Sequence, residues 1–530
     1  MQVQPQPVNY LKLKTDLFKT LFRSKIVKIA VLSVLSGLFF GLAQPPFNQW
    51  ELTIVAISFL VISVYNVSFK QKFLIGFISG VVQYVISLTW VTGFSVPGYL
   101  VIVLYDSLLI GVASLFIPAA KYKNRSALLK SLIVGLSFSL IDAFKSRFPF
   151  GGLPIDGFAI SQSDSFFRNY AILGGEPLIV FAVFTFSALI SYLFLNLLEN
   201  KGALTKYVRT TEFVLTVLFL LIIVGSSQAI LFSENTTATD YFEAVAVQGG
   251  GKTGLRAVIN GNQQLVFYNQ FVESLKISKK VNFILWPEDT VGLTGPLIGS
   301  GDYLTLKHLA INSKATLLVG VTEPKGSNQF LNLAVMINPK GKIIGSYLKV
   351  HRVPFGEYVP YRPFFQHFGN VNLVPRDAVK GTKPGVLNSP VGKIGIMISF
   401  EVFFDTRAFA SVKNGAEVMF VPTNTASYVG VQMPSQELGA LKIRAVETDR
   451  YILMTSPTGY SAEVTPHGNI VSISKLNVPA LIYAKIGLIR YKTLFDRIGD
   501  TPILIGEMFS LLLLYALQYF RKTRSQGSII

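Results

Sequence analysis

Long apolar stretches separated by short polar turns fill the first 234 residues of the chain. Each stretch is of a length that can cross the hydrocarbon core of a bilayer as a helix. A further stretch of this kind lies near the C-terminus. The expected spans are 27–43, 51–68, 73–94, 98–119, 128–146, 171–198, 212–233 and 502–520. The pattern therefore predicts a multi-pass α-helical membrane bundle of about eight spans.

From Phe242 onward the pattern changes to short apolar runs that alternate with amphipathic stretches. Short runs rich in β-branched and aromatic residues are typical of strands, and the longer periodic stretches are typical of helices. We expect strands at 242–248, 281–286, 315–322, 330–338, 342–348, 392–398, 416–421, 451–455, 460–464, 470–474 and 480–485. We expect helices near 262–278, 302–312, 403–413 and 434–449. This alternation predicts one large α/β sandwich domain.

The distribution of basic residues orients this bundle. The net charge is +19, but only 15% of the residues are charged. Basic residues occupy every second connection, whereas the turns 44–50 and 95–97 contain no Lys or Arg. Because basic connections stay in the cytoplasm, both termini are expected there and the α/β domain is expected on the extracytoplasmic side. The basic excess is thus a membrane-topology signal, and nucleic acid is not expected as a partner.

These patterns divide the chain into five parts. They are a cytoplasmic basic tail (1–26), a seven-span bundle (27–234), an extracytoplasmic domain (235–500), a final transmembrane helix (501–520) and a cytoplasmic basic tail (521–530).

Three expected strand ends carry ionisable or hydroxyl side chains. Glu288 follows a strand in FILWPEDT, Lys349 and Glu357 lie in YLKVHRVPFGEYVP, and Ser399 and Glu401 lie in VGKIGIMISFEVFFD. A carboxylate can take the proton of a nucleophile, and an ammonium group can stabilise the oxyanion that forms. A second carboxylate can hold the lysine in place. Each residue alone is more typical of a solvated surface or a helix cap, but the ordered set favours a catalytic site.

Cysteine and metal chemistry are not indicated. The chain has no cysteine, which excludes disulfides, thiolate metal ligands and a cysteine nucleophile. The four histidines, His308, His351, His367 and His467, do not have the spacing of metal ligands. We therefore expect neither a metal nor a cofactor.

The motifs WPE, YLKVHRVPFGEYVP and GIMISFE resemble those of the apolipoprotein N-acyltransferases, which are membrane-embedded members of the nitrilase, or carbon–nitrogen hydrolase, superfamily. VAVQGG (245–250), TNTASY (423–428) and RAVETDRY (444–451) resemble further segments of that family. The resemblance extends over nearly the whole chain and implies an αββα sandwich. It also implies a multi-pass protein of the cell membrane.

The resemblance implies a role for each site residue. Glu288 would be the general base, Lys349 the oxyanion-stabilising lysine and Ser399 the nucleophile. Glu357 and Glu401 would support them. The implied reaction moves an acyl chain from a phospholipid through an acyl-enzyme to the N-terminal amine of a diacylglyceryl-cysteine lipoprotein.

The sequence departs from this family at the nucleophile, where the family has cysteine and this chain has Ser399. A hydroxyl is a weaker nucleophile than a thiol and needs a well-placed base. The serine is compatible with a working variant, with a family member that has lost catalysis, or with an engineered substitution. Two further functions stay open at this point: a catalytically silent membrane scaffold or partner, and a membrane-tethered nitrilase-type amidase.

Overall fold

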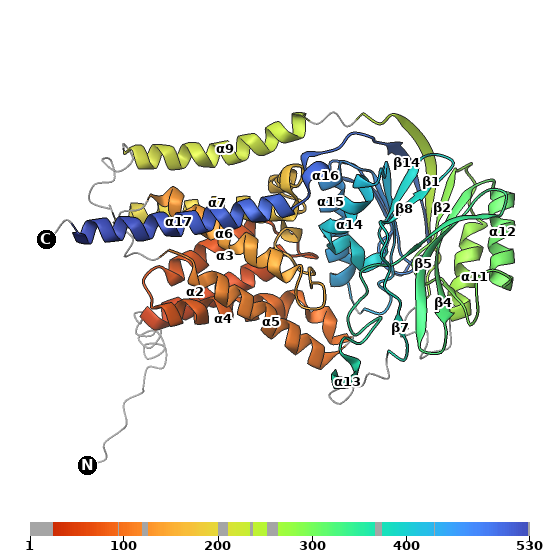
Figure 1. The fold of residues 1–530 in the computed structure, drawn as a ribbon, viewed down its shortest axis with the longest axis horizontal. Coiled ribbons are helices and arrows are strands. Elements are labelled where there is room, and N and C mark those ends of the chain that lie inside the picture. The colour runs from red at the N-terminus through yellow and green to blue at the C-terminus, as the bar shows by residue number, and fades with distance from the viewer. Residues whose placement is uncertain are drawn as a thin grey trace, which may run out of the picture.

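A helical bundle and an α/β domain lie end to end in the computed structural model (Figure 1). The structure describes residues 25–93, 95–118, 126–199, 210–233, 237–251, 263–365, 374–428 and 430–527. Most of the expected N-terminal tail and the last three residues lie outside these ranges. The multi-pass bundle and the α/β sandwich that the sequence predicts are both present.

The bundle contains a helix at each of the eight expected positions. They are α2 (Lys25–Ala43), α3 (Glu51–Val64), α4 (Phe69–Ser87), α5 (Val96–Leu115), α6 (Ala127–Lys145), α7 (Ala171–Glu199), α9 (Thr211–Ser233) and α17 (Thr501–Gly527). Among the described residues, five helices are long and apolar enough to cross a membrane, namely α2, α5, α6, α7 and α9. The apolar helices at Glu51–Val64 and Thr501–Ala516 are shorter. The chain is thus a membrane protein, and the count of eight spans stays a prediction.

Small residues let the bundle helices approach closely. A Cβ atom on Gly37 of α2 would lie 2.2 Å from the carbonyl oxygen of Ser79 on α4. One on Gly76 of α4 would lie 2.1 Å from Ser114 Oγ on α5. Larger side chains at either glycine would force these helices apart. Close packing of this kind is a main source of helix association in a membrane, where the hydrophobic effect contributes little.

The domain contains two sheets. The first has the order β14-β1-β2-β4-β5-β6, and the second has the order β13-β12-β11-β10-β9-β8. The strands of the first sheet are β1 (Asp240–Gln248), β2 (Phe283–Leu285), β3 (Val291–Gly292), β4 (Thr316–Lys325), β5 (Gln329–Ile337), β6 (Ile343–Leu348), β7 (Asp377–Ala378) and β14 (Ala480–Leu488). Those of the second are β8 (Val386–Asn388), β9 (Lys393–Ile396), β10 (Val418–Pro422), β11 (Ile452–Thr455), β12 (Ala462–Val464) and β13 (Ile470–Ile473).

All eleven strands expected from the sequence are present, but β3, β7 and β8 were not predicted. Each of these has two or three residues, which is too short for an alternating pattern to be recognised. The four expected helices of the domain correspond to α11 (Gln263–Ser274), α12 (Gly301–Ser313), α14 (Asp405–Lys413) and α15 (Gln432–Thr448). A short helix, α16 (Leu494–Ile498), was also not predicted.

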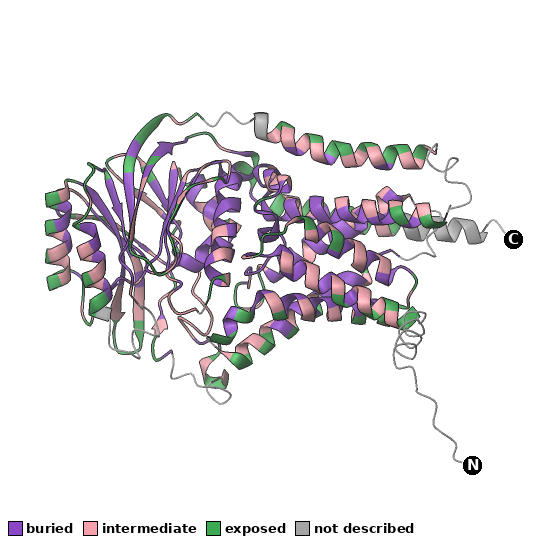
Figure 2. Ribbon diagram, turned by 180° about the vertical axis from the view of Figure 1, so that it is seen from behind, coloured by how far each residue is buried: buried purple, intermediate pink, exposed green. Residues whose placement is uncertain are grey.

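The two sheets pack face to face in an αββα arrangement. Phe242 and Phe283 of the first sheet meet Phe420 of the second in the core between them. The helices α11 and α12 cover the outer face of the first sheet, and α14 and α15 lie between the second sheet and the bundle (Figure 1). Buried residues are continuous from the bundle through α15 to the second sheet (Figure 2). The domain is therefore packed directly onto the bundle.

Polar contacts fix α15 to the end of α4. The Gln432 side chain donates a hydrogen bond to the Ile86 carbonyl at 2.8 Å, and Gln436 donates to the Ser87 carbonyl at 2.8 Å. These carbonyls belong to the last turn of α4, where helical partners are missing. The same Gln436 accepts a hydrogen bond from the indole N–H of Trp90 at 3.2 Å. The contacts set the position of the strand ends relative to the bundle.

Candidate functional site

The three residues proposed from the sequence as a catalytic set each follow a strand. Glu288 lies after β2, Lys349 directly after β6, and Ser399 after β9. All three are buried, with exposed fractions of 5%, 1% and 7%. A charged residue is rarely buried unless it is paired. These residues therefore do not lie on solvent-exposed loops, and the two charged ones, Glu288 and Lys349, are expected to have partners.

Lys349 lies between two carboxylates. Its Nζ atom is 2.7 Å from Glu288 Oε1 and 2.7 Å from Glu357 Oε1. Asn332 on β5 donates hydrogen bonds to the same two oxygens, at 2.8 Å and 3.1 Å. The backbone N–H of Val353 donates to the other oxygen of Glu357 at 2.8 Å. The structure thus brings Glu288, Lys349 and Glu357 into one hydrogen-bonded group.

Burial and charge oppose each other in this group. Burial raises the pKa of Glu288, while the adjacent Lys349 ammonium acts in the opposite direction. Burial alone would lower the pKa of Lys349, but Glu288 and Glu357 outweigh it and raise that pKa above its usual value. Lys349 consequently stays charged at neutral pH, next to a carboxylate that is more basic than an ordinary glutamate.

Ser399 occupies a sharp turn between β9 and a short 3₁₀ helix, η6 (Ser399–Phe403). Its φ angle is +49°, in the left-handed region that residues other than glycine rarely adopt. Its hydroxyl makes no hydrogen bond among the described residues. Strained backbone of this kind recurs where a strand-to-helix turn presents a nucleophile. The nucleophile role of Ser399 stays a prediction.

Glu401 links the segment after β6 to the segment after β9. It accepts hydrogen bonds from the backbone N–H groups of Val350 at 2.8 Å, His351 at 3.1 Å and Ile398 at 2.8 Å. The Tyr347 hydroxyl donates to the same carboxylate at 2.8 Å. Burial raises the pKa of Glu401, and the backbone N–H groups oppose this rise. Glu401 thereby fixes the backbone of Lys349 and Ser399 relative to each other.

Sequence reasoning missed several residues of this site. Asn332 could have been found from the sequence, because it is the one polar residue inside the apolar run FLNLAVMI (330–337). An amide in such a run is expected to be buried and therefore to need hydrogen-bond partners. Tyr428, the last residue of the segment TNTASY (423–428), was not assigned to the site. It lies close enough to Lys349, Glu357 and Glu288 to feel their charges, and burial raises its pKa.

Tyr428 also contacts the bundle. Its ring meets that of Trp90 edge-on, with ring centroids 4.8 Å apart. Trp90 belongs to the 3₁₀ segment η1 (Thr89–Gly93), which follows α4. The site is thus bordered by a side chain from the membrane bundle. Within the described ranges, no group of three or more His, Asp or Glu residues is arranged to hold a metal ion.

Two protein-family models match the chain. Residues 36–189 match the apolipoprotein N-acyltransferase N-terminal domain, and residues 278–493 match the carbon–nitrogen hydrolase domain. The first match covers the bundle from α2 to α7. The second covers Glu288, Lys349, Glu357, Ser399 and Glu401.

Curated relatives carry the same combination. The chain is 24% identical to the apolipoprotein N-acyltransferase of Geobacter metallireducens, over 89% of this chain and 91% of the relative. It is 26% identical to that of Nostoc, over 88% and 96%. A match to the Mycolicibacterium smegmatis enzyme is 32% identical, but it spans only 46% of this chain and 43% of that relative.

Among solved structures, Saccharomyces cerevisiae Nit3 is a member of the nitrilase superfamily and is 22% identical to this chain. The match covers 47% of this chain and 91% of that chain, with a TM-score of 0.35.

The family models match both halves of the chain in the expected order, and two relatives of one name match it over nearly their full length. The chain belongs to the apolipoprotein N-acyltransferase family.

Proposed function

We propose that the protein transfers an acyl chain from a phospholipid to the N-terminal amine of a diacylglyceryl-cysteine lipoprotein. The observation that carries the proposal is the buried Glu288–Lys349–Glu357 group, joined through Glu401 to the strained turn at Ser399. The domain that holds this group is packed on a membrane bundle. Both substrates are anchored in lipid, so this placement lets them reach one site.

In the first half-reaction, Glu288 takes the proton of the Ser399 hydroxyl while the oxygen attacks the ester carbonyl of the phospholipid. The Lys349 ammonium stabilises the negative charge that develops on the carbonyl oxygen. The lysophospholipid then leaves and takes the proton from Glu288. The acyl chain remains on Ser399 as an oxygen ester.

In the second half-reaction, the lipoprotein amine attacks this ester. Glu288 accepts a proton from the amine and returns it to the Ser399 oxygen as the ester bond breaks. The product is an amide, and the serine is regenerated. Glu357 keeps Lys349 in place through both steps, and Glu401 keeps Lys349 and Ser399 in register.

The location follows from the same proposal. Basic connections on alternate turns support an extracytoplasmic position for residues 235–500 at the cell membrane. The spans 27–234 and 501–520 hold the domain at that surface, and the tails 1–26 and 521–530 face the cytoplasm.

The test is product formation by the full-length protein with labelled phospholipid and a diacylglyceryl lipopeptide. Wild type should yield N-acylated lipopeptide, while Ser399→Ala and Glu288→Gln should lower the yield by about a thousandfold, as expected when a nucleophile or its base is removed. Glu463→Gln is the matched control, because Glu463 is also buried but lies on β12. Product that survives Ser399→Ala would reject the nucleophile. No product from wild type together with activity in Ser399→Cys would favour a silent protein.

The pH dependence of kcat/KM should show an acidic limb. Glu288 must be ionised to act as a base, and its pKa is raised by burial, so activity should rise with pH through a value above the ~4.3 of an ordinary glutamate. Lys349 has a raised pKa and should remain charged throughout the neutral range. Measuring kcat/KM from about pH 4 to about pH 9 checks this. A flat profile at the acidic end would contradict Glu288 as the base.

A further inference from the structure

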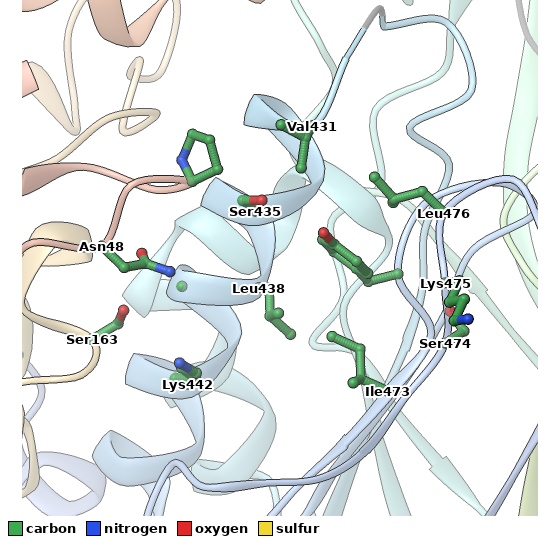
Figure 3. Close-up of a pocket in the computed structure, with 13 residues that line it drawn as sticks. Asn48, Ser163, Val431, Ser435, Leu438, Lys442, Ile473, Ser474, Lys475 and Leu476 are labelled. Atoms are coloured by element: carbon green, nitrogen blue, oxygen red, sulfur yellow. The ribbon is translucent and has the colours of Figure 1, made fainter. Parts of the chain in front are cut away.

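A pocket opens between the bundle and the domain. Its volume is about 530 Å³, within the range of ligand-binding cavities. Neither Glu288, Lys349 nor Ser399 lines it. Asn48 and Ser163 lie on one side and Ile473, Ser474, Lys475 and Leu476 on the other, with one face of α15 between them (Figure 3). The pocket is therefore built from both parts of the protein.

The lining of this pocket is cationic. Lys442 and Lys475 line it, and none of the described lining residues is a carboxylate. Lys442 donates to Asp164 at 2.6 Å, which uses one of its three N–H groups. Behind the wall, the Arg168 guanidinium donates to the Ser163 carbonyl at 2.9 Å and adds a further positive charge. Lys442, Lys475 and Arg168 thus supply three positive charges against the Asp164 carboxylate that Lys442 bonds, and the pocket favours an anion.

Neutral donors complete the lining. The hydroxyls of Ser435 and Tyr460 line the pocket and make no hydrogen bond among the described residues. The first turn of α15 also lies at the pocket, and its N-cap residue Val431 supplies no side-chain acceptor. Pro434 has no N–H and the Ser435 N–H bonds the Val431 carbonyl, so the N–H groups of Gln432 and Met433 are those of this turn that lack a helical partner and favour negative charge. A phosphate group, with a full charge and several acceptor oxygens, matches these donors.

The position of the pocket favours a lipid headgroup over free phosphate as its ligand. It lies where α2 ends and α3 begins, at the end of the bundle that faces the domain (Figure 1). Large apolar side chains are exposed around it: Phe47 at 44%, Ile473 at 43% and Val431 at 38%. Exposed apolar residues beside a cationic recess suit the surface of a bilayer, where acyl chains adjoin phosphates. A free phosphate would not require the apolar rim.

We propose that this pocket binds the phosphate of an anionic phospholipid headgroup, at a site separate from that of the acyl donor. The bound lipid contacts the turn after α2, α15 and the segment after β13 at once. It thereby holds the domain on the bundle at the membrane surface. This inference does not depend on the acyl-transfer proposal.

Lipid binding to the full-length protein in detergent micelles tests the proposal, with native mass spectrometry as the readout. Lys475→Gln removes an exposed charge and should weaken phosphatidylglycerol binding about fivefold. Ser435→Phe fills the pocket without breaking a described hydrogen bond and should abolish binding there. Lys340→Gln, an exposed lysine in the turn between β5 and β6, is the matched control and should bind as wild type does. Phosphatidylcholine, which has no net charge, should bind more weakly than phosphatidylglycerol.

Equal phosphatidylglycerol affinity in wild type, Lys475→Gln and Ser435→Phe would overturn the proposal. Binding of inorganic phosphate as tight as that of phosphatidylglycerol would overturn it too, since the site would then belong to free phosphate. If Ser435→Phe fails to fold, the exposed Lys475→Gln variant still decides the result. Because binding is measured without turnover, a loss here is distinguishable from failure of the catalytic assignment.

Discussion

Replacing Ser399 with cysteine should raise the rate of acyl transfer by at least about tenfold, because a thiol is partly ionised near neutral pH and is intrinsically more nucleophilic than a hydroxyl. The gain should appear in both half-reactions, since a thioester also reacts faster with an amine than an oxygen ester does. The measurement is the rate of N-acylated lipopeptide formation under single-turnover and steady-state conditions.

The intermediate offers an independent check on this prediction. Acyl-enzyme trapped on Ser399→Cys should be released by neutral hydroxylamine, whereas the oxygen ester on wild type should resist it. Ser313→Cys, at the end of α12, is the matched control and should behave as wild type does. A rate for Ser399→Cys at or below that of wild type would contradict the prediction. It would mean that the strained turn and the Glu288 base suit a hydroxyl specifically.

Replacing Arg444 with methionine should destabilise the protein by about 3–5 kcal/mol, the usual effect of removing one partner from a buried ionic group. Arg444 lies on α15 and is fully buried. Its guanidinium is 2.5 Å from Glu176 on α7 and 3.1 Å from Glu447 on α15. The variant leaves these carboxylates buried without their counter-charge at the contact between bundle and domain. A lower melting temperature in detergent micelles is the measurement.

The ion pair of the exposed Arg490 with Glu417, at 2.9 Å, supplies the matched control. Arg490→Met should change stability by only about 0–1 kcal/mol, because the side chain of Arg490 is largely in solvent. Adding Glu447→Gln to Arg444→Met should recover part of the lost stability, because it removes one of the carboxylates left without a counter-charge. Strictly additive effects of these two changes would contradict a coupled ionic group.

The deficit of Arg444→Met should also depend on pH. Burial raises the pKa of Asp405 to about 8 and the pKa of Glu447 well above its usual value. A carboxyl with a raised folded-state pKa binds more protons in the folded than in the unfolded state, so its contribution to stability falls as pH rises above the unfolded value of about 4. Without Arg444 these pKa values rise further. The deficit should therefore be smaller near pH 5 than near pH 8.

Much of the fold could be predicted because local patterns of apolar and polar residues determine most of its helices and strands. Long apolar runs mark the bundle helices, and alternation marks strands such as β1 (Asp240–Gln248) and β14 (Ala480–Leu488). The short strands β3, β7 and β8 escaped prediction, because two or three residues hold no period. Glu288, Lys349, Glu357, Ser399 and Glu401 were recognised as an ordered set at three expected strand ends, since each alone is more typical of a solvated surface or a helix cap.

The tertiary structure alone decided how these residues meet. The contacts of Lys349 depend on the strand order β2-β4-β5-β6, which brings Asn332 of β5 and Glu288, after β2, beside it. The bond network of Glu401 spans both sheets, and the Trp90–Tyr428 contact joins the bundle to the domain. The pocket at Lys442 and Lys475 likewise draws on five segments that lie apart in the sequence. A sequence pattern reports the burial of each residue against its neighbours, whereas strand order and domain packing determine which distant residues touch.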